Sequence, residues 1–132
     1  MHRVITGHVG EGRHRLEYTA VATEGGLTVT LTGGDRAHVG AVAVAQPRPS
    51  LKDPRRTSAS TSVITVVGHQ DDEVARPLAH LLAANTGQPA AVSIGIHWDD
   101  CTADDIEASR AMVMEAGRAV LSALKSSEAS QA

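Results

Sequence analysis

The fold of this chain is decided by residues 61–97, which read TSVITVVGHQDDEVARPLAHLLAANTGQPAAVSIGIH. Two apolar runs, 61–67 and 90–96, are rich in β-branched residues and predict strands. Between them, Val74, Leu78 and Leu82 recur at the spacing of one helix face, and a glycine at 87 is typical of a helix end. The stretch therefore predicts a β-α-β unit, whose strands run parallel if both join one sheet.

Three further strands are expected upstream of this unit. Residues 14–23 alternate between apolar and polar, Glu24-Gly25-Gly26 indicates a hairpin turn, and residues 27–32 alternate strictly. Residues 39–45 are small and apolar and predict a third strand. A last helix follows Thr102, which forms a capping box with Asp105. The expected fold class is α+β, an antiparallel β-meander followed by α-β-α with the helices packed on one face of the sheet.

The length and composition predict one domain across residues 1–132. A chain of 132 residues with 42% hydrophobic residues can build one ordinary core. We expect an ordered core over about residues 14–125 and a frayed tail at 126–132, where the residues are small and polar. Residues 46–60 contain three prolines and predict a flexible loop between the third and fourth strands.

The composition also excludes several functions. A net charge of −3 and the near absence of aromatic residues argue against nucleic-acid binding. No apolar stretch is long enough to span a membrane, and no apolar leader begins the chain. The single cysteine, Cys101, fits a reducing compartment and is best explained as a turn residue, so we expect a cytoplasmic protein.

Three histidine clusters follow or precede predicted strands. The pattern His-x-Asp-Asp occurs at 69–72 and again at 97–100, and His38 follows the glycine pair 33–34. In the expected topology, the start of strand 39–45 and the ends of strands 61–67 and 90–96 lie at one end of the sheet. We call this end the rim, and we expect His38, His69 and His97 to meet there.

Such a rim predicts an anion site, a metal site or both. Two helix N-termini open onto it and offer N–H groups to a phosphate. The histidines, with Asp71 and Asp99, are suitable ligands for a divalent metal. The structural alternative is that each histidine bonds its own turn and that Asp71 only caps a helix. Because Asp99 has no such explanation, it is the better functional candidate.

The loop at 46–60 is locally cationic. It holds Arg48, Lys52, Arg55 and Arg56 against one acid, Asp53. Two interpretations stay open: a solvated flap, or a lid that closes over an anion at the rim, with the hydroxyl groups of residues 57–62 nearby.

Catalytic motifs are missing from the sequence. It contains no Gly-x-Ser-x-Gly, His-Glu-x-x-His, Walker A or Gly-x-Gly-x-x-Gly pattern. The paired acids at 71–72 and 99–100 are adjacent in the chain, so their side chains are expected to point in different directions. They therefore do not form acid–base dyads. A small metal-dependent enzyme is therefore the least favoured alternative.

Five segments carry a family resemblance: GGDRAHVGAVA (33–43), RPS (48–50), TSASTSV (57–63), GHQDDE (68–73) and GIHWD (95–99). Together they resemble the prenylated-flavin chaperone LpdD-like family, a prokaryotic family named after the D component of gallate decarboxylase and similar to proteasome assembly chaperone 4. The resemblance covers about residues 14–125. The chain departs from the family pattern at Ala37, Gln70 and Trp98, where proline, lysine and a small residue are usual.

The resemblance implies a non-catalytic chaperone that binds prenylated FMN, or FMN, and assists its maturation or its delivery to a UbiD-type decarboxylase. It also implies a proteasome-assembly-chaperone-like fold and a homodimer through sheet or helix faces. A divalent metal held by His38, His69, His97, Asp71 and Asp99 would bridge to the cofactor phosphate, over which Arg48, Arg55 and Arg56 would close. The alternative is a protein-assembly chaperone whose rim is only structural. The residues expected to bind the cofactor are Gly34, Asp35, Arg36, His38, Arg48, Arg55, Arg56, Ser58, Ser60, Thr61, Gly68, His69, His97 and Trp98.

Overall fold

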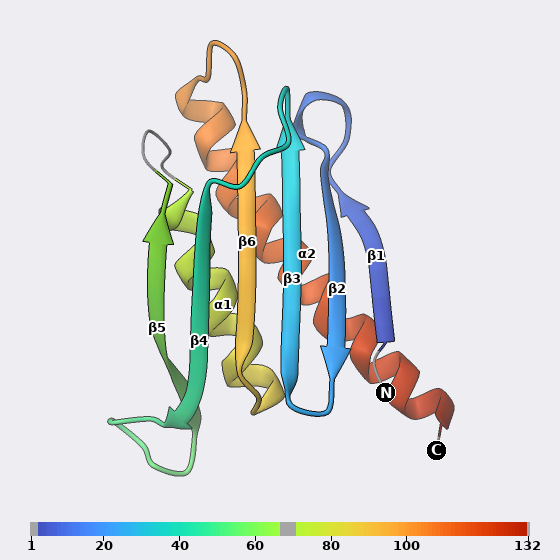
Figure 1. Cartoon of the computed structure of the whole chain (residues 1–132), viewed down its shortest axis with the longest axis vertical. Helices are drawn as coiled ribbons and strands as arrows, with labels where there is room; N and C mark the ends of the chain where they lie inside the picture. Colours follow the sequence, from blue (N-terminus) through green and yellow to red (C-terminus); the bar gives the residue numbers. More distant parts are fainter. Residues whose placement is uncertain (1–2, 67–70, 132) are drawn as a thin grey trace.

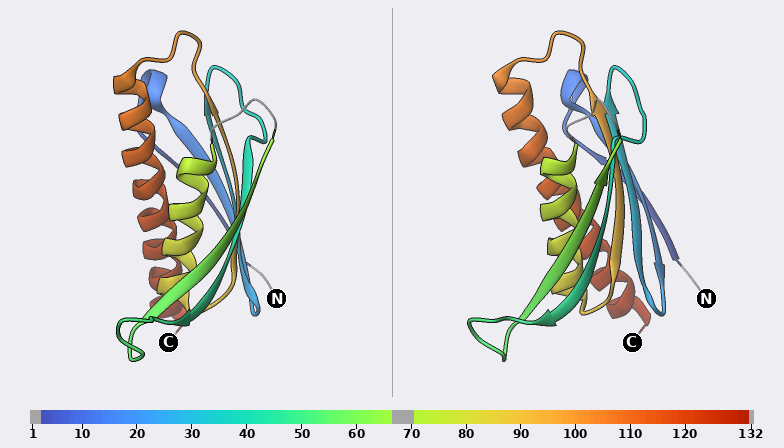
Figure 2. Two further views of the ribbon diagram at one scale, coloured as in Figure 1. Left: turned by 90° about the vertical axis from the view of Figure 1, so that its left-hand side faces the viewer. Right: turned by 60° about the vertical axis from the view of Figure 1, so that its left-hand side comes forward.

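The computed structural model describes residues 3–66 and 71–131, without the side chains of residues 72 and 127–131. In these residues six strands form one mixed sheet, and two helices pack on one of its faces (Figures 1 and 2). This confirms the α+β class and the position of the helices. The elements are β1 (Arg3–Val9), the 3-10 helix η1 (Gly12–His14), β2 (Leu16–Thr23), β3 (Gly26–Gly34), β4 (Ala41–Pro49), β5 (Thr57–Thr65), α1 (Asp72–Thr86), β6 (Ala90–His97) and α2 (Ala103–Gln131).

The strand order is β1-β2-β3-β6-β4-β5. The last strand, β6, lies between β3 and β4, parallel to β3 and antiparallel to β4, so the direct β3–β4 pairing of a simple meander does not form. Ala90, Val92 and Ile94 of β6 are buried under the helices, and a strand this apolar is favoured at the centre of a sheet. β5 and β6 run in the same direction on either side of β4, as the β-α-β unit predicted.

An N-terminal strand was not expected, because the ordered core was predicted to begin at residue 14. β1 pairs along its whole length with β2, from Arg3 opposite Ala22 to Val9 opposite Leu16. A glycine at position 7 is typical of a loop, yet here Gly7 lies within a strand and leaves room for a neighbouring side chain. A Cβ at Gly7 would collide with the ring of Tyr18, which lies opposite it in the register.

The predicted flexible loop at 46–60 is wrong for most of its length. β4 and β5 continue to pair from Gln46 opposite Ser60 to Pro49 opposite Thr57, which leaves only residues 50–56 as a turn. β4 pairs with β6 only as far as Ala45, so one edge of β4 is free beyond that point. Prolines are tolerated on such a free edge because no ladder hydrogen bond needs their missing N–H.

The core lies between the sheet and the helices. Its largest fully buried side chains are Leu16, Leu31, Leu78, Leu82, Ile94, Val92, Val113 and Val120. Gly117 lets α2 approach α1 closely, because a Cβ there would meet the side chains of Leu78 and Leu81. α2 continues to Gln131, so the frayed tail predicted from residue 126 is wrong for the backbone.

The other face of the sheet carries no helix among the described residues (Figure 2). It exposes Val42 and Val44 of β4 and Ile64 of β5. None of the described helices is long and apolar enough to cross a membrane.

Candidate functional site

The rim is the end of the sheet where β3, β5 and β6 end and β4 begins, at the top of Figure 1. His38 reaches it from the connection between β3 and β4, and His97 is the last residue of β6. Their ring centroids lie 6.4 Å apart with the rings nearly perpendicular. The structure thus brings these two histidines together, whereas His69 and Gly68 lie outside the described residues.

Asp71 is the buried acid of the rim, with 8% of its surface exposed. Its Oδ2 lies 3.3 Å from His38 Nε2, and its Oδ1 accepts a hydrogen bond of 3.1 Å from the backbone N–H of Ile96. Asp71 occupies the N-cap position of α1, but its side chain makes no capping hydrogen bond. The interpretation of this carboxylate as a helix cap is therefore wrong, and it binds a histidine and the end of β6 instead.

Asp99 is largely exposed and belongs to a network between two loops. Its Oδ1 lies 3.0 Å from His97 Nε2 and 3.7 Å from the guanidinium of Arg36. Its backbone N–H donates to Asp35 Oδ2 at 2.7 Å, and Asp35 in turn donates its own N–H to the carbonyl of His97 at 2.6 Å. The loop after β3 and the loop after β6 are thereby fastened to one another, with Gly34 at φ +80° making the turn.

A groove at the rim lies between the first turns of α1 and α2 and the end of β6. Its volume of about 520 Å³ is in the range of small-molecule sites. We call it the rim groove, and its lining residues are Asp71, Glu73, Val74, Ile96, His97, Trp98, Cys101, Ile106, Ser109 and Arg110.

Trp98 forms one wall of the rim groove and is held rigidly. Its Nε1 donates a hydrogen bond of 2.7 Å to the carbonyl of Arg13, and its ring meets His14 edge-on at 5.3 Å. Only 5% of its surface is exposed. The ring therefore keeps one position in the wall of the groove but presents little of its surface to a ligand.

Arg110 lines the rim groove beside the acids Asp71 and Glu73. Its Nη2 lies 2.9 Å from Glu73 Oε2, so an ion pair joins α2 to α1 beside the groove. Glu73, Ser109 and Arg110 of the groove were not predicted from the sequence. Ile106, Ser109 and Arg110 stand at i, i+3 and i+4 of one helix face, and this pattern would have placed them on one side of α2.

The predicted capping box at α2 is confirmed. Asp105 N–H donates to Thr102 Oγ1 at 3.1 Å, and Thr102 N–H donates to Asp105 Oδ2 at 3.0 Å. The same carboxylate bonds His14 Nε2 at 2.8 Å and Arg13 Nη2 at 3.2 Å. The Thr102 N–H, followed by His14 and Arg13, holds the pKa of Asp105 well below its usual range. The first turn of α2 therefore satisfies some of its own donors, and less of it is free for an anion than the sequence suggested.

A second hollow of about 400 Å³ lies beside the end of β3 and is separate from the residues of the rim groove. Gly34 and Asp35 line it together with Arg13 and Arg15. Of the residues predicted to bind the cofactor at the rim, His97 and Trp98 line the rim groove and Gly34 and Asp35 line this second hollow. Arg36 and His38 line neither.

The cationic lid predicted over the rim is wrong. β4 has nine residues and leads about 25 Å away from the rim, so Arg48, Arg55 and Arg56 lie at the opposite end of the sheet (Figure 1). Arg48 donates to Ser60 Oγ at 2.8 Å there, and Arg55 pairs with Asp53. The prediction fails because β4 and β5 pair over more residues than expected, so that the turn between them lies far from the rim. Ser58 and Ser60 belong to the same far half of β5, and Thr61 stands at its midpoint.

A metal cluster is not complete among residues 3–66 and 71–131, where no three His, Cys, Asp or Glu side chains are arranged to hold an ion. His38 and His97 each face a carboxylate, of Asp71 and Asp99 respectively. The five-residue metal set includes His69, so it stays a prediction.

The fold places the chain in the structural class of a proteasome assembly chaperone. Its sheet and helices match a chain from a solved chaperone complex for yeast 20S proteasome assembly, with a TM-score of 0.59 and 13% identity, over 95% of this chain and 96% of that one. At this identity the likeness concerns the fold alone. Within the class, the chain belongs to the prenylated flavin chaperone LpdD-like family, whose model matches residues 10–125. No curated protein matches the chain significantly. The family resemblance found in the sequence is thus confirmed.

Proposed function

We propose that this protein is a non-catalytic, cytoplasmic chaperone that binds prenylated FMN, or FMN, in the rim groove. It holds the cofactor for maturation or for delivery to a UbiD-type decarboxylase. The observation that carries the proposal is the rim groove itself, which combines a fixed tryptophan, a histidine and an arginine within about 520 Å³. Membership in the family supports the choice of flavin.

The groove residues suit the two chemical parts of a flavin mononucleotide. Arg110, which is paired with Glu73, offers a forked cation to the phosphate. Val74, Ile106 and Trp98 offer an apolar wall to the flat ring system. The chain performs no bond-making step on the cofactor in this proposal; it binds, orients and shields it.

We further propose that a divalent metal can bridge the phosphate to the rim. Its ligands would be His38, His69, His97, Asp71 and Asp99. Imidazole nitrogens and carboxylate oxygens are common ligands of divalent first-row metals, and four of the five side chains lie at the rim.

Trp98 is the single tryptophan of the chain, so its fluorescence reports directly on the rim groove. Titration with reduced prenylated FMN, and with FMN, should quench this fluorescence and yield protein with flavin absorbance. Arg110→Met should weaken binding about tenfold or more, because a charged hydrogen bond to phosphate is lost. Arg55→Met, at the far end of the sheet, is the matched control and should bind as the unaltered protein does.

Absence of bound flavin from the unaltered protein would refute the proposal. An Arg55→Met variant weakened as much as Arg110→Met would place the phosphate elsewhere. Repeating the titration with a chelator tests the metal separately: unchanged affinity rejects the metal bridge and leaves the flavin site in place.

A second candidate function is protein assembly, and the uncovered face of the sheet favours it. Val42, Val44 and Ile64 are exposed there by 38%, 44% and 76%. A contiguous apolar surface of this kind is typical of protein interfaces. We propose that a second copy of the chain covers it and forms a homodimer. If assembly is the sole function, His97→Ala should leave partner binding unchanged and the protein should hold no flavin.

A further inference from the structure

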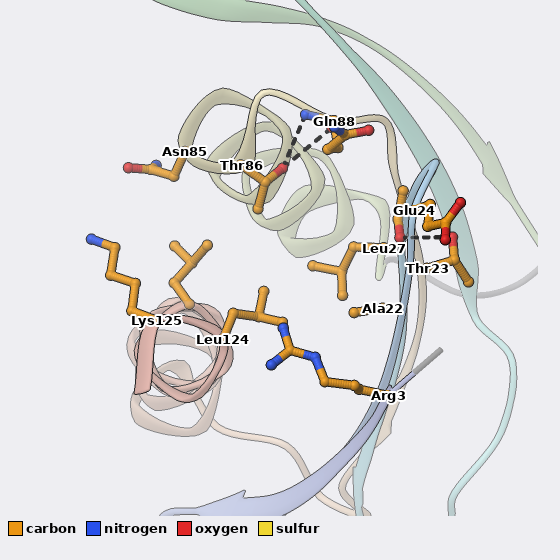
Figure 3. A pocket seen from close by; sticks show the side chains of 12 residues that line it. Arg3, Ala22, Thr23, Glu24, Leu27, Asn85, Thr86, Gln88, Leu124 and Lys125 are labelled. Atoms are coloured by element: carbon orange, nitrogen blue, oxygen red, sulfur yellow. Dashed lines mark hydrogen bonds between the residues drawn. The ribbon is translucent and has the colours of Figure 1, made fainter. Parts of the chain in front are cut away.

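A pocket at the end of the molecule opposite the rim has no role in the proposed function. It lies between the β2–β3 hairpin, the last turn of α1 and the C-terminal part of α2, and its volume is about 350 Å³ (Figure 3). We call it the basal pocket. The whole length of β6 separates it from the rim, so it is independent of the rim groove.

Arg3 gives the basal pocket its chemical character. β1 alternates between its two faces, and Arg3 lies on the same face as Ile5 and Val9, toward the helices. Figure 3 shows its side chain extending from β1 toward Leu124. Its Nη1 is buried and has no hydrogen-bond partner among the parts of residues 3–66 and 71–131 that the structure describes. An unsatisfied buried donor is costly, and more so when it is charged, which indicates that a partner is missing.

A second cation and an apolar wall complete the pocket. Lys125 of α2 also lines it, whereas Glu24 supplies one negative charge from the side opposite Lys125 (Figure 3). Leu27, Leu121 and Leu124 form the apolar part of the lining. The pocket thus has two positive charges, one negative charge and three leucines. This lining favours a ligand with an acidic head and a hydrocarbon body.

We propose that the basal pocket binds a small amphipathic carboxylate. The planar carboxylate pairs with the guanidinium of Arg3, whose forked donors match its geometry, and Lys125 adds a second positive charge. The hydrocarbon part lies against Leu27 and Leu124. A free phosphate would satisfy the arginine but would leave the leucine wall without contact, so the apolar body distinguishes this ligand from a simple anion.

The test uses hexanoate and its neutral analogue hexanamide, followed by amide chemical shifts of the full chain. Hexanoate should give saturable shifts at Leu27 and Leu124, and hexanamide should bind about tenfold more weakly or worse. Arg3→Met keeps most of the side-chain volume and should reduce hexanoate affinity at least tenfold, and Lys125→Met should reduce it less. Arg118→Met is the matched control, because Arg118 is exposed on α2 and does not line the pocket.

Several results would overturn the proposal. These are no saturable shifts with hexanoate, equal binding of hexanamide, or equal losses in Arg3→Met and Arg118→Met. Full displacement of hexanoate by an equal concentration of inorganic phosphate would indicate a general anion site instead. Arg3→Met should keep or raise the melting temperature, since it removes an unsatisfied donor. If it does not fold, Lys125→Met and the comparison of hexanoate with hexanamide still decide the question.

Discussion

His38 and Asp71 face each other at the rim, with 3.3 Å between Nε2 and Oδ2. The histidine precedes β4 and the aspartate begins α1, while the other carboxylate oxygen accepts the N–H of Ile96 at the end of β6. One buried carboxylate therefore joins three segments that are distant in the sequence. A Cβ at Gly40 would collide with this carboxylate, so the contact also needs a residue without a side chain beside it.

Removing this carboxylate should destabilise the fold. Asp71→Ala leaves the Ile96 N–H without its partner and takes the acid away from His38, so we expect a loss of about 1–3 kcal/mol in the free energy of unfolding. Urea unfolding measures this. Asp99→Ala is the control, because Asp99 is exposed and its removal should cost about 0.5 kcal/mol or less. Equal losses in the two variants would mean that Asp71 is no more than a surface residue.

Asp105 should make stability depend on pH. Its pKa in the folded protein is lowered from 3.8, chiefly by the Thr102 N–H and then by His14 and Arg13. Because this pKa is lowered, the ionised Asp105 carboxylate stabilises the folded protein. The stabilisation is complete above pH 3.8 and is lost as the pH falls through the lower pKa that Asp105 has in the folded protein. Asp105→Asn should therefore be less stable than the unaltered protein near neutral pH, and the two should converge in acid.

The measurement for Asp105 is urea unfolding at a series of pH values from about 6 down to 3. Asp104→Asn is the matched control, because Asp104 stands in the same helical turn but is exposed. Its stability should run parallel to that of the unaltered protein over the whole series. A constant gap between Asp105→Asn and the unaltered protein down to the lowest pH would contradict the prediction.

Gly95 of β6 should not tolerate a side chain. The backbone of His38 crosses directly over it, and a Cβ would collide with the carbonyl of His38. Gly95→Ala should cost about 1–3 kcal/mol or more, because backbone cannot move aside as a flexible side chain can. Gly25→Ala is the control, since nothing lies within 4 Å of its Cβ position. The contact between the His38 and His97 rings, followed by nuclear Overhauser effects, should be lost only in Gly95→Ala.

The sequence predicted the parts of the fold that local patterns determine. The alternation at 27–32, the hairpin turn at Glu24-Gly25 and the capping box at Thr102 depend on neighbouring residues, and each is present in the structure. The order of strands depends on which strand buries most apolar surface between its neighbours. That is a property of the whole sheet, so the apolar residues of β6 agree with its central position but do not by themselves predict it.

The sequence predicted correctly that His38 and His97 meet at the rim, but it predicted the wrong arginines beside them. Strand direction brought His38 and His97 to one rim, because direction follows from the β-α-β unit. The arginines of the β4–β5 turn were misplaced because Ser, Thr and Pro residues looked like a loop, although an edge hairpin accepts them. The cation that lines the rim groove, Arg110, stands within the N-terminal part of α2, where no turn signal marks it.

The uncovered face of the sheet should be the interface of the proposed homodimer. Val42 lies directly opposite Ile64 in the β4–β5 register, and Val44 follows on the same face. Val44→Lys would place a charge in the desolvated interface and should convert a dimer to a monomer in sedimentation experiments. Leu51→Lys is the control: Leu51 is 88% exposed on the turn between β4 and β5, outside this face, so the dimer should persist. A monomeric unaltered protein at high concentration, or a Val44→Lys variant that stays dimeric, would reject this face as the interface.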